Sequence, residues 1–311
     1  MARKDILEIN LKAKTDPRSL IRAAEDRYRN FTLDVADRVA KDEKIRIILL
    51  AGPSGSGKTT TANMLADSIR SNGLFSFVLS LDNFYRNAND PKYPRFDDGE
   101  RDYESLDALD LDALEQTLVN IAEGCEFSVP RYDFKTGMRE SVSNHPKISH
   151  GCVIIEGLHA LNPRIFEHLP RERILRIFIS VSANITYGGE ELISGKKIRF
   201  LRRMIRDSIY RGADAERTLE MWDGVLLGEN KYLYPYREYA DLQFDTFHDF
   251  ELGVMSSYAK RLISKELAEQ SEYAKAVLYA INLAEPIDEA LVPQESLIRE
   301  FITGGIYEEF Y

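Results

Sequence analysis

The most informative segment of this chain reads Gly52-Pro53-Ser54-Gly55-Ser56-Gly57-Lys58-Thr59. It has the spacing G-x-x-x-x-G-K-[ST], in which backbone N–H groups surround the phosphates of a nucleotide. Glycines permit positive φ and a close approach of the backbone to a ligand. Lys58 is expected to reach the β- and γ-phosphates, and the Thr59 hydroxyl is expected to bind Mg²⁺. The segment therefore predicts a nucleoside triphosphate site, with ATP and Mg²⁺ as cofactors.

The flanking residues support this interpretation. Residues 45–51 form an apolar run of the kind found in buried parallel strands. Residues 60–70 follow a helical pattern that Asn72-Gly73 ends. A strand, a glycine loop and a helix in this order direct a helix N-terminus at an anion. The residues expected to bind the triphosphate are Gly52, Ser54, Gly55, Ser56, Gly57, Lys58, Thr59 and Thr60.

Composition excludes several other classes of protein. The chain has 311 residues, 44% hydrophobic and 30% charged, which is typical of a globular protein. Its net charge of −10 argues against a nucleic-acid partner, and no apolar run is long enough for a membrane span. No signal peptide is evident, and Cys125 and Cys152 cannot make a disulfide framework. We expect a cytoplasmic protein that acts on a small molecule.

Further apolar runs predict strands at 74–81, 153–157, 174–181 and 239–245, with a helix at 105–124 and a hairpin tip at Thr136-Gly137. Strands that alternate with helices predict an α/β fold with a parallel sheet covered on both faces. We expect a P-loop domain over 43–265, with a lid region at about 183–230, and helical extensions over 1–42 and 266–311. Residues 183–197, which include Gly188-Gly189, are expected to be a mobile lid segment.

One predicted helix, over 198–211, has a stripe of arginines. Arg199, Arg202, Arg203 and Arg206 share one side of it with Tyr210. Such a stripe is often a solvated surface, but after a phosphate loop in an acidic protein it favours contact with phosphate.

Two carboxylates follow predicted strands, where ligands bind in open parallel sheets. Asp82 is suited to accept a proton from an attacking hydroxyl, and Thr59, Asp82 and Glu156 are suited to Mg²⁺. With Lys58 and Arg206 these groups predict phosphoryl transfer. No Asn-Lys-x-Asp sequence is present to read guanine, which excludes a regulatory GTPase.

The chain resembles the uridine kinase and phosphoribulokinase family of P-loop kinases, and in particular bacterial uridine-kinase-like nucleoside kinases. The resemblance spans about residues 45–250 and rests on 52–59, 80–85, 103–110, 130–134, 153–157, 202–207 and Arg211-Gly212. It implies that Asp82 is the catalytic base and that Tyr85 and Tyr132 line a nucleoside pocket. It also implies that Arg203 lies at the ribose hydroxyls, that Arg206 and Arg211 contact phosphates, and that the protein is a homo-oligomer.

The sequence departs from uridine kinases where the acceptor would bind. Glu104 stands in place of the ribose-binding aspartate, Gly137 in place of a base-reading histidine and Ala213 in place of a base-reading arginine. A site without these groups loses much of its selectivity for a base. The leading hypothesis is therefore a nucleoside kinase that phosphorylates a 5′-hydroxyl. The alternatives are a kinase of a sugar, sugar phosphate or polyol, and a nucleotide-binding regulator without turnover. The intact Lys58 and Asp82 argue against the last.

Overall fold

The fold is built on a central parallel sheet, seen in a computed structural model that describes residues 3–95 and 99–310. Its strand order is β10-β7-β2-β6-β3, with every neighbouring pair parallel. The strands are β2 (Ile47–Ala51), β3 (Phe75–Ser80), β6 (Gly151–Glu156), β7 (Ile174–Ser180) and β10 (Leu242–Asp245). Each lies within or overlaps a predicted strand, and the segment that carries the phosphate loop occupies the centre.

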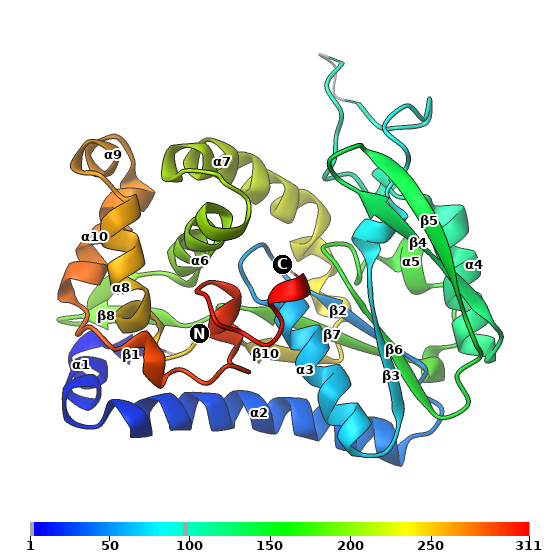
Figure 1. Ribbon diagram of the computed structural model, residues 1–311, viewed down its shortest axis with the longest axis horizontal. Helices are drawn as coiled ribbons and strands as arrows, with labels where there is room; N and C mark the ends of the chain where they lie inside the picture. Colours follow the sequence, from blue (N-terminus) through cyan, green and yellow to red (C-terminus); the bar gives the residue numbers. More distant parts are fainter. Residues whose placement is uncertain (1–2, 96–98, 311) are drawn as a thin grey trace.

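Helices cover both faces of this sheet, as predicted for the α/β class (Figure 1). Helices α2 (Pro17–Lys41) and α3 (Lys58–Ser71) pack on the face that includes Ile48 and Leu50. Helices α4 (Leu111–Glu123) and α5 (Pro163–Phe166) pack on the opposite face with Ile47 and Leu49. Successive side chains of a strand point to opposite faces, so the continuous apolar run of β2 fills two cores.

The predicted helix over 105–124 is shorter in the structure. Ser105 caps a 3₁₀ turn, η2 (Leu106–Ala108), and Asp110 caps α4 separately through the N–H of Ala113. Two capping side chains in sequence divide the helix, because each satisfies backbone donors at a new start. Gly124 ends α4 with a φ of 72°, as the sequence indicates.

A hairpin stands at one end of the molecule (Figure 1). Its strands β4 (Phe127–Asp133) and β5 (Met138–His145) are antiparallel. Gly137 adopts a φ of 69° in the connecting turn, which confirms the predicted hairpin tip.

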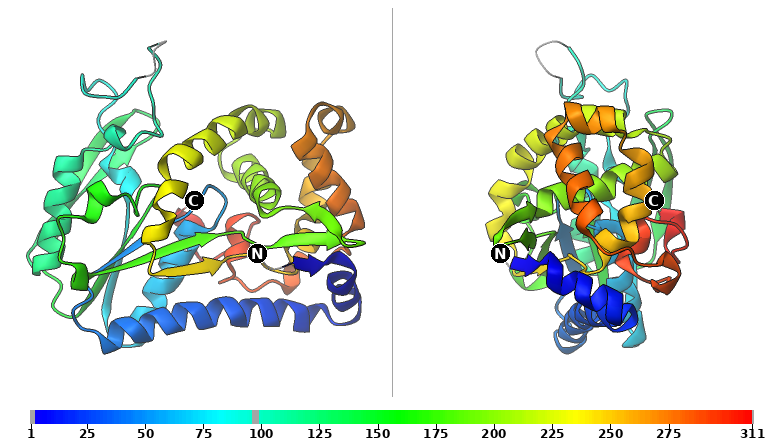
Figure 2. Two further views of the ribbon diagram at one scale, coloured as in Figure 1. Left: turned by 180° about the vertical axis from the view of Figure 1, so that it is seen from behind. Right: turned by 90° about the vertical axis from the view of Figure 1, so that its left-hand side faces the viewer.

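Residues 183–197, which the sequence analysis expects to be mobile, instead form strands β8 (Asn184–Tyr187) and β9 (Glu190–Ile193). β8 also pairs in parallel with β1 (Arg3–Asp5) at the N-terminal end (Figure 2). Ile185 and Ile193 are fully buried, because the apolar side of the hairpin faces a helical core.

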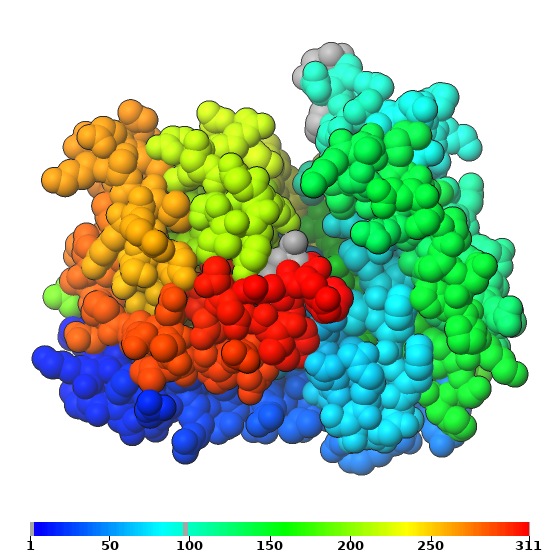
Figure 3. All heavy atoms as spheres, in the orientation of Figure 1, coloured from blue at the N-terminus to red at the C-terminus, as the bar shows by residue number. Residues whose placement is uncertain are grey.

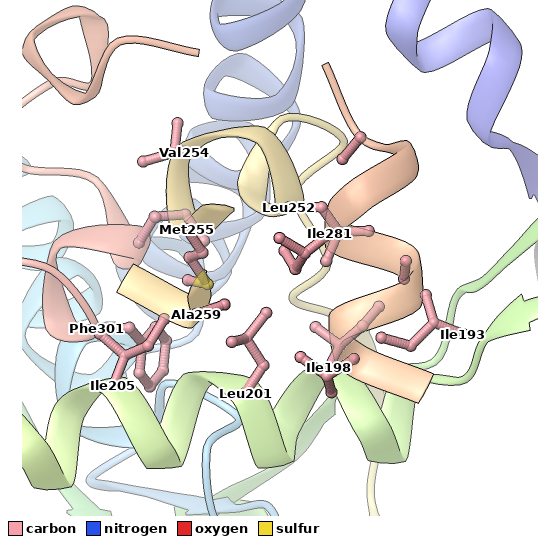
Figure 4. Packing of buried hydrophobic residues seen from close by; sticks show 14 of the residues in the cluster. Ile193, Ile198, Leu201, Ile205, Leu252, Val254, Met255, Ala259, Ile281 and Phe301 are labelled. Atoms are coloured by element: carbon pink, nitrogen blue, oxygen red, sulfur yellow. The ribbon is translucent and has the colours of Figure 1, made fainter. Parts of the chain in front are cut away.

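That helical core joins the two ends of the chain. It contains α1 (Ile6–Thr15), α6 (Gly195–Tyr210), α8 (Glu251–Leu262) and α10 (Glu272–Leu283), with α7 (Ala215–Tyr232) and α9 (Lys265–Gln270) packed against it. Leu201 and Ile205 of α6 lie together with Met255 and Phe301 (Figure 4). Asp16 caps α2 ahead of Pro17. The last segment passes through a 3₁₀ turn, η6 (Leu297–Glu300), beside α3.

Candidate active site

The phosphate loop depends on its glycines for both conformation and space. Gly55 and Gly57 have φ values of 72° and 85°, and Gly57 directly precedes α3. A Cβ atom on Gly55 would lie 2.7 Å from the carbonyl oxygen of Arg199, and one on Gly57 would lie 2.5 Å from Leu297 Cδ1. Only glycine fits such positions, so the loop can present its N–H groups at the start of the helix.

A buried ion pair holds the loop at Ser54. Arg199 and Glu229 make two hydrogen bonds, of 2.8 and 2.9 Å, with side-chain exposures of 2% and 1%. Arg199 Nη1 also donates to the carbonyl oxygen of Ser54 at 2.8 Å, and Glu229 Oε1 accepts from the N–H of Ser54 at 2.8 Å. Both backbone polar groups of Ser54 are thereby fixed.

A second buried pair holds Gly55. Arg202 donates to both oxygens of Glu251, at 2.6 and 3.0 Å, and to the carbonyl oxygen of Gly55 at 3.2 Å. The arginine stripe therefore divides. Arg199 and Arg202 bind the backbone of the loop and do not line the cavity in front of it, because Glu229 on α7 and Glu251 on α8 hold them in ion pairs. The phosphate contact expected for the whole stripe is therefore wrong for these two residues.

A cavity of about 230 Å³ lies in front of the loop. The predicted site residues that line it are Ser54, Gly55, Gly57, Lys58, Thr59, Asp82, Tyr85, Glu104, Glu156, Arg203, Arg206 and Arg211. Gly52, Ser56, Thr60 and Tyr132 are not among its lining residues. Gly52 is required by space, since a Cβ atom there would lie 2.5 Å from the carbonyl oxygen of Ile179.

The carboxylates of the cavity are poised to hold protons or cations. Asp82 is reached by solvent but lies deep among protein atoms, and this desolvation raises its pKa, which Lys58 and Arg211 partly lower. Burial, with the nearby charge of Asp82, raises the pKa of Glu156 to about 7. Burial lowers the pKa of Lys58, whereas Glu156 acts in the opposite direction. Burial disfavours the charged form of each of these side chains, and a ligand of opposite charge in the cavity would stabilise that form.

Three arginines that line the cavity share one carboxylate. Asp207 lies 3.1 Å from Arg203 Nε, 3.0 Å from Arg206 Nη2 and 3.5 Å from Arg211 Nη1. Arg203 also donates to Ser54 Oγ at 2.8 Å. Asp207 was missed as a site residue, although it stands four residues from both Arg203 and Arg211, a spacing that places them on one helix face.

Other cavity residues had weaker signals in the sequence. Glu229 and Glu300 line the cavity but belong to segments without a motif. His159 also lines the cavity, and burial lowers its pKa to about 4, so the ring is neutral.

A second, aromatic cavity of about 220 Å³ adjoins the first through Tyr85, which lines both. Tyr132 and Phe134 complete a cluster with ring centroids 5.1 to 5.7 Å apart. Arg101 and Lys135 also line this space. Tyr132 therefore lies beside the cavity of the phosphate loop rather than in it.

The residues present fit Mg·ATP. Positive-φ glycines and Lys58 suit phosphates, while the oxygens of Thr59, Asp82 and Glu156 are hard ligands of the type that Mg²⁺ prefers. Among the described residues no group of three or more histidine, cysteine, aspartate or glutamate side chains is arranged to hold a metal by itself. Mg²⁺ commonly binds one or two carboxylates together with phosphates and water. No helix within 3–95 or 99–310 is long and apolar enough to cross a membrane.

The central parallel sheet, the glycine loop at its middle strand and the cavity lined by Lys58 and Asp82 define a P-loop kinase. The chain belongs to the Phosphoribulokinase / Uridine kinase family, whose profile matches residues 47–252. It is thus related to phosphotransferases with an alcohol group as acceptor.

Individual relatives are distant. A uridine kinase of Borrelia hermsii is 31% identical over 72% of this chain and 98% of its own length. A uridine kinase of Schizosaccharomyces pombe is 29% identical over 74% of this chain, which spans only 46% of that protein. A solved D-glycerate 3-kinase of Cryptococcus neoformans aligns with a TM-score of 0.43 and 17% identity, covering 67% of this chain and 87% of its own.

Proposed function

We propose that this protein is an ATP-dependent kinase that transfers the γ-phosphoryl group to a hydroxyl of a small molecule, with the 5′-hydroxyl of a nucleoside as the first candidate. The observation that carries the proposal is a pair of adjoining cavities that share Tyr85 as a lining residue. The phosphate loop, Lys58 and Asp82 line one cavity, and Tyr85 connects it to an aromatic cavity. The donor phosphates and a planar acceptor would therefore meet at Asp82.

In this mechanism Asp82 acts as the general base and accepts the proton of the acceptor hydroxyl. The hydroxyl oxygen bonds to the γ-phosphorus while the bond to the β–γ bridging oxygen breaks, which leaves ADP. Lys58, Arg206 and Arg211 stabilise the negative charge on the phosphoryl group. Mg²⁺, held by Thr59, Asp82 or Glu156 directly or through water, would neutralise charge on the β- and γ-phosphates.

The aromatic cavity is suited to bind an aromatic or planar acceptor. It lacks the histidine side chain that would recognise uracil. Three rings of Tyr85, Tyr132 and Phe134 offer stacking surfaces. At Gly137, the position of the base-reading histidine, φ is 69° and a Cβ atom would lie 2.9 Å from Ala88 Cβ. The backbone itself thus disfavours a side chain there. A nucleoside remains the first candidate, and a sugar, sugar phosphate or polyol the second. Glu104 and Arg203 would contact the acceptor's hydroxyls.

The test is ADP release from Mg·ATP against a panel of nucleosides, pentoses, pentose phosphates and polyols. A kinase releases ADP with one class of acceptor, and Asp82→Asn should lower kcat by about 10²–10⁴-fold while ATP binding is retained. An active Asp82→Asn variant would contradict the role of Asp82. ATP binding without ADP release for any acceptor would favour the non-catalytic regulator. A cytoplasmic location, inferred from the composition, and a homo-oligomeric state, implied by the resemblance, remain proposals.

A further inference from the structure

The C-terminal segment of the chain reaches the phosphate loop, although it lies outside the matched residues 47–252. Leu297 fills the space beside Gly57, where a Cβ atom would lie 2.5 Å from Leu297 Cδ1. Glu300, at the end of η6, lines the same cavity as Lys58. Figure 3 shows the C-terminal residues in red at the centre of this face, beside α3 in cyan.

This segment is a fixed part of the core. Leu297, Ile298, Phe301 and Ile302 each have 0% of their surface exposed. Arg299 donates hydrogen bonds to the carbonyl oxygens of Glu289, Val292, Pro293 and Thr303. Displacing the segment would expose these apolar side chains and break these bonds, so it forms a permanent wall of the cavity.

Glu300 uses its carboxylate on two groups at the site. Its Oε2 accepts from Thr60 Oγ1 at 2.8 Å, and its Oε1 lies 3.7 Å from Arg206 Nη1. Thr60 is fully buried in the first turn of α3, the turn whose N–H groups face the phosphate cradle. From the N-terminal side, Tyr28 Oη lies 2.5 Å from Thr61 Oγ1 in the same turn. The start of α3 is thus held by both ends of the chain.

We propose that the segment Leu297–Glu300 completes the donor nucleotide site, and that Glu300 is a positioning residue that fixes the first turn of α3 through Thr60 and the Arg206 guanidinium for the triphosphate. This inference rests on the proposed function, because it takes Mg·ATP as the donor. The negative charge of Glu300 also repels phosphates nearby. Positioning by Glu300 therefore strengthens Mg·ATP binding, whereas this repulsion weakens it. Positioning requires that loss of Glu300 weakens binding, whereas simple repulsion requires that the loss strengthens it.

The experiment is calorimetric titration of the full chain with Mg·ATP. Glu300→Leu removes the acceptor of the Thr60 hydrogen bond and should weaken binding about tenfold. Glu300→Gln keeps an acceptor oxygen for Thr60 and should bind within about threefold of the wild-type protein. The matched control is Glu295→Leu, which removes an exposed carboxylate five residues earlier in the same segment. It should leave affinity unchanged. Thermal melting of each variant checks that it is folded.

A double-mutant cycle tests the route through Thr60. In a Thr60→Val background, Glu300→Leu should cause little further loss of affinity if the two residues act together. Equal or tighter binding by folded Glu300→Leu would overturn the inference while leaving the kinase proposal intact, as would equal weakening by Glu300→Gln and Glu300→Leu. If the wild-type chain fails to bind Mg·ATP, the donor assignment falls and this inference falls with it.

Discussion

Arg199 and Glu229 form a buried ion pair that binds both backbone polar groups of Ser54 in the phosphate loop. Arg199 donates to the carbonyl oxygen of Ser54, and Glu229 accepts a hydrogen bond from the backbone N–H of Ser54. The pair is almost fully buried, with side-chain exposures of 2% and 1%. A buried pair of this kind contributes geometry more reliably than net stability, because desolvation offsets much of the attraction. Its role here is to set the shape of the loop.

Arg199→Met should destabilise the protein by about 3–5 kcal/mol, because Glu229 would keep a buried charge without its partner. The double variant Arg199→Met, Glu229→Leu should recover part of that stability but still bind Mg·ATP more weakly, since Ser54 loses both contacts. Urea denaturation and calorimetry measure the two effects. As a control, Arg217→Met breaks the exposed pair with Glu220, whose side-chain exposures are 63% and 66%. That change should cost no more than about 1 kcal/mol. Full stability in the single Arg199 variant would contradict the prediction.

Asp207→Asn should lower kcat/KM about a hundredfold, since a misplaced catalytic group can cost that much. The carboxylate of Asp207 contacts Arg203, Arg206 and Arg211, so the loss of its charge frees three cavity arginines together. Steady-state kinetics with the acceptor found in the panel is the measurement. Asp214→Asn serves as control, because Asp214 caps α7 and makes no cavity contact. Unchanged kinetics in Asp207→Asn would show that the arginines do not need it.

Tyr132→Ala should raise the KM of the acceptor about tenfold or more and leave the KM of ATP nearly unchanged, because stacking on an aromatic ring is worth about 1–3 kcal/mol. Tyr132 lines the aromatic cavity but not the cavity of the phosphate loop. Tyr132→Phe should retain most activity. Tyr239→Ala, which removes a ring packed on Phe166, is the control for general loss of an aromatic side chain. A matching rise in the KM of ATP would place Tyr132 elsewhere in the mechanism.

The stability of the fold should depend on the protonation of Glu25. Burial raises the pKa of Glu25 from 4.5 to about 7, with Glu295 and Asp26 acting in the same direction and the Ser296 hydroxyl and Arg29 against it. His248, 3.9 Å away, stays neutral because burial lowers its pKa to about 3. The folded state therefore holds the Glu25 proton to a higher pH than the unfolded chain. Its contribution to stability is present below about pH 4.5 and is lost as pH rises to about 7.

Glu25→Gln replaces the carboxyl group with a neutral amide that does not titrate. The variant should be more stable than the wild-type protein by about 2–3 kcal/mol near pH 8, and the difference should shrink as pH falls through about 7 and vanish below about pH 4.5. Chemical denaturation at several pH values measures it. Glu43→Gln, on the exposed turn after α2, should show no such gain. A pH-independent effect of Glu25→Gln would mean that Glu25 does not carry a proton in the folded state.

Local patterns in the sequence determined the phosphate loop, the strands and the main helices. Neighbours within a few residues determine the motif at 52–59, the apolar run of β2 and the turn at Gly137. Side-chain periodicity and backbone conformation act at that range, so they can be predicted from one sequence. The placement of Lys58, Asp82 and Glu156 at one cavity followed, because parallel strands end at a common edge.

The tertiary structure alone decided how the arginines and the chain ends are used. A helical wheel puts Arg199, Arg202, Arg203 and Arg206 on one side, but acidic partners from other helices turn the first two to the back of the loop. Thr60 meets Glu300 across 240 residues of sequence. Periodicity carries no information about contacts at such separation, because they are set by how the helical core brings the two ends of the chain to α3.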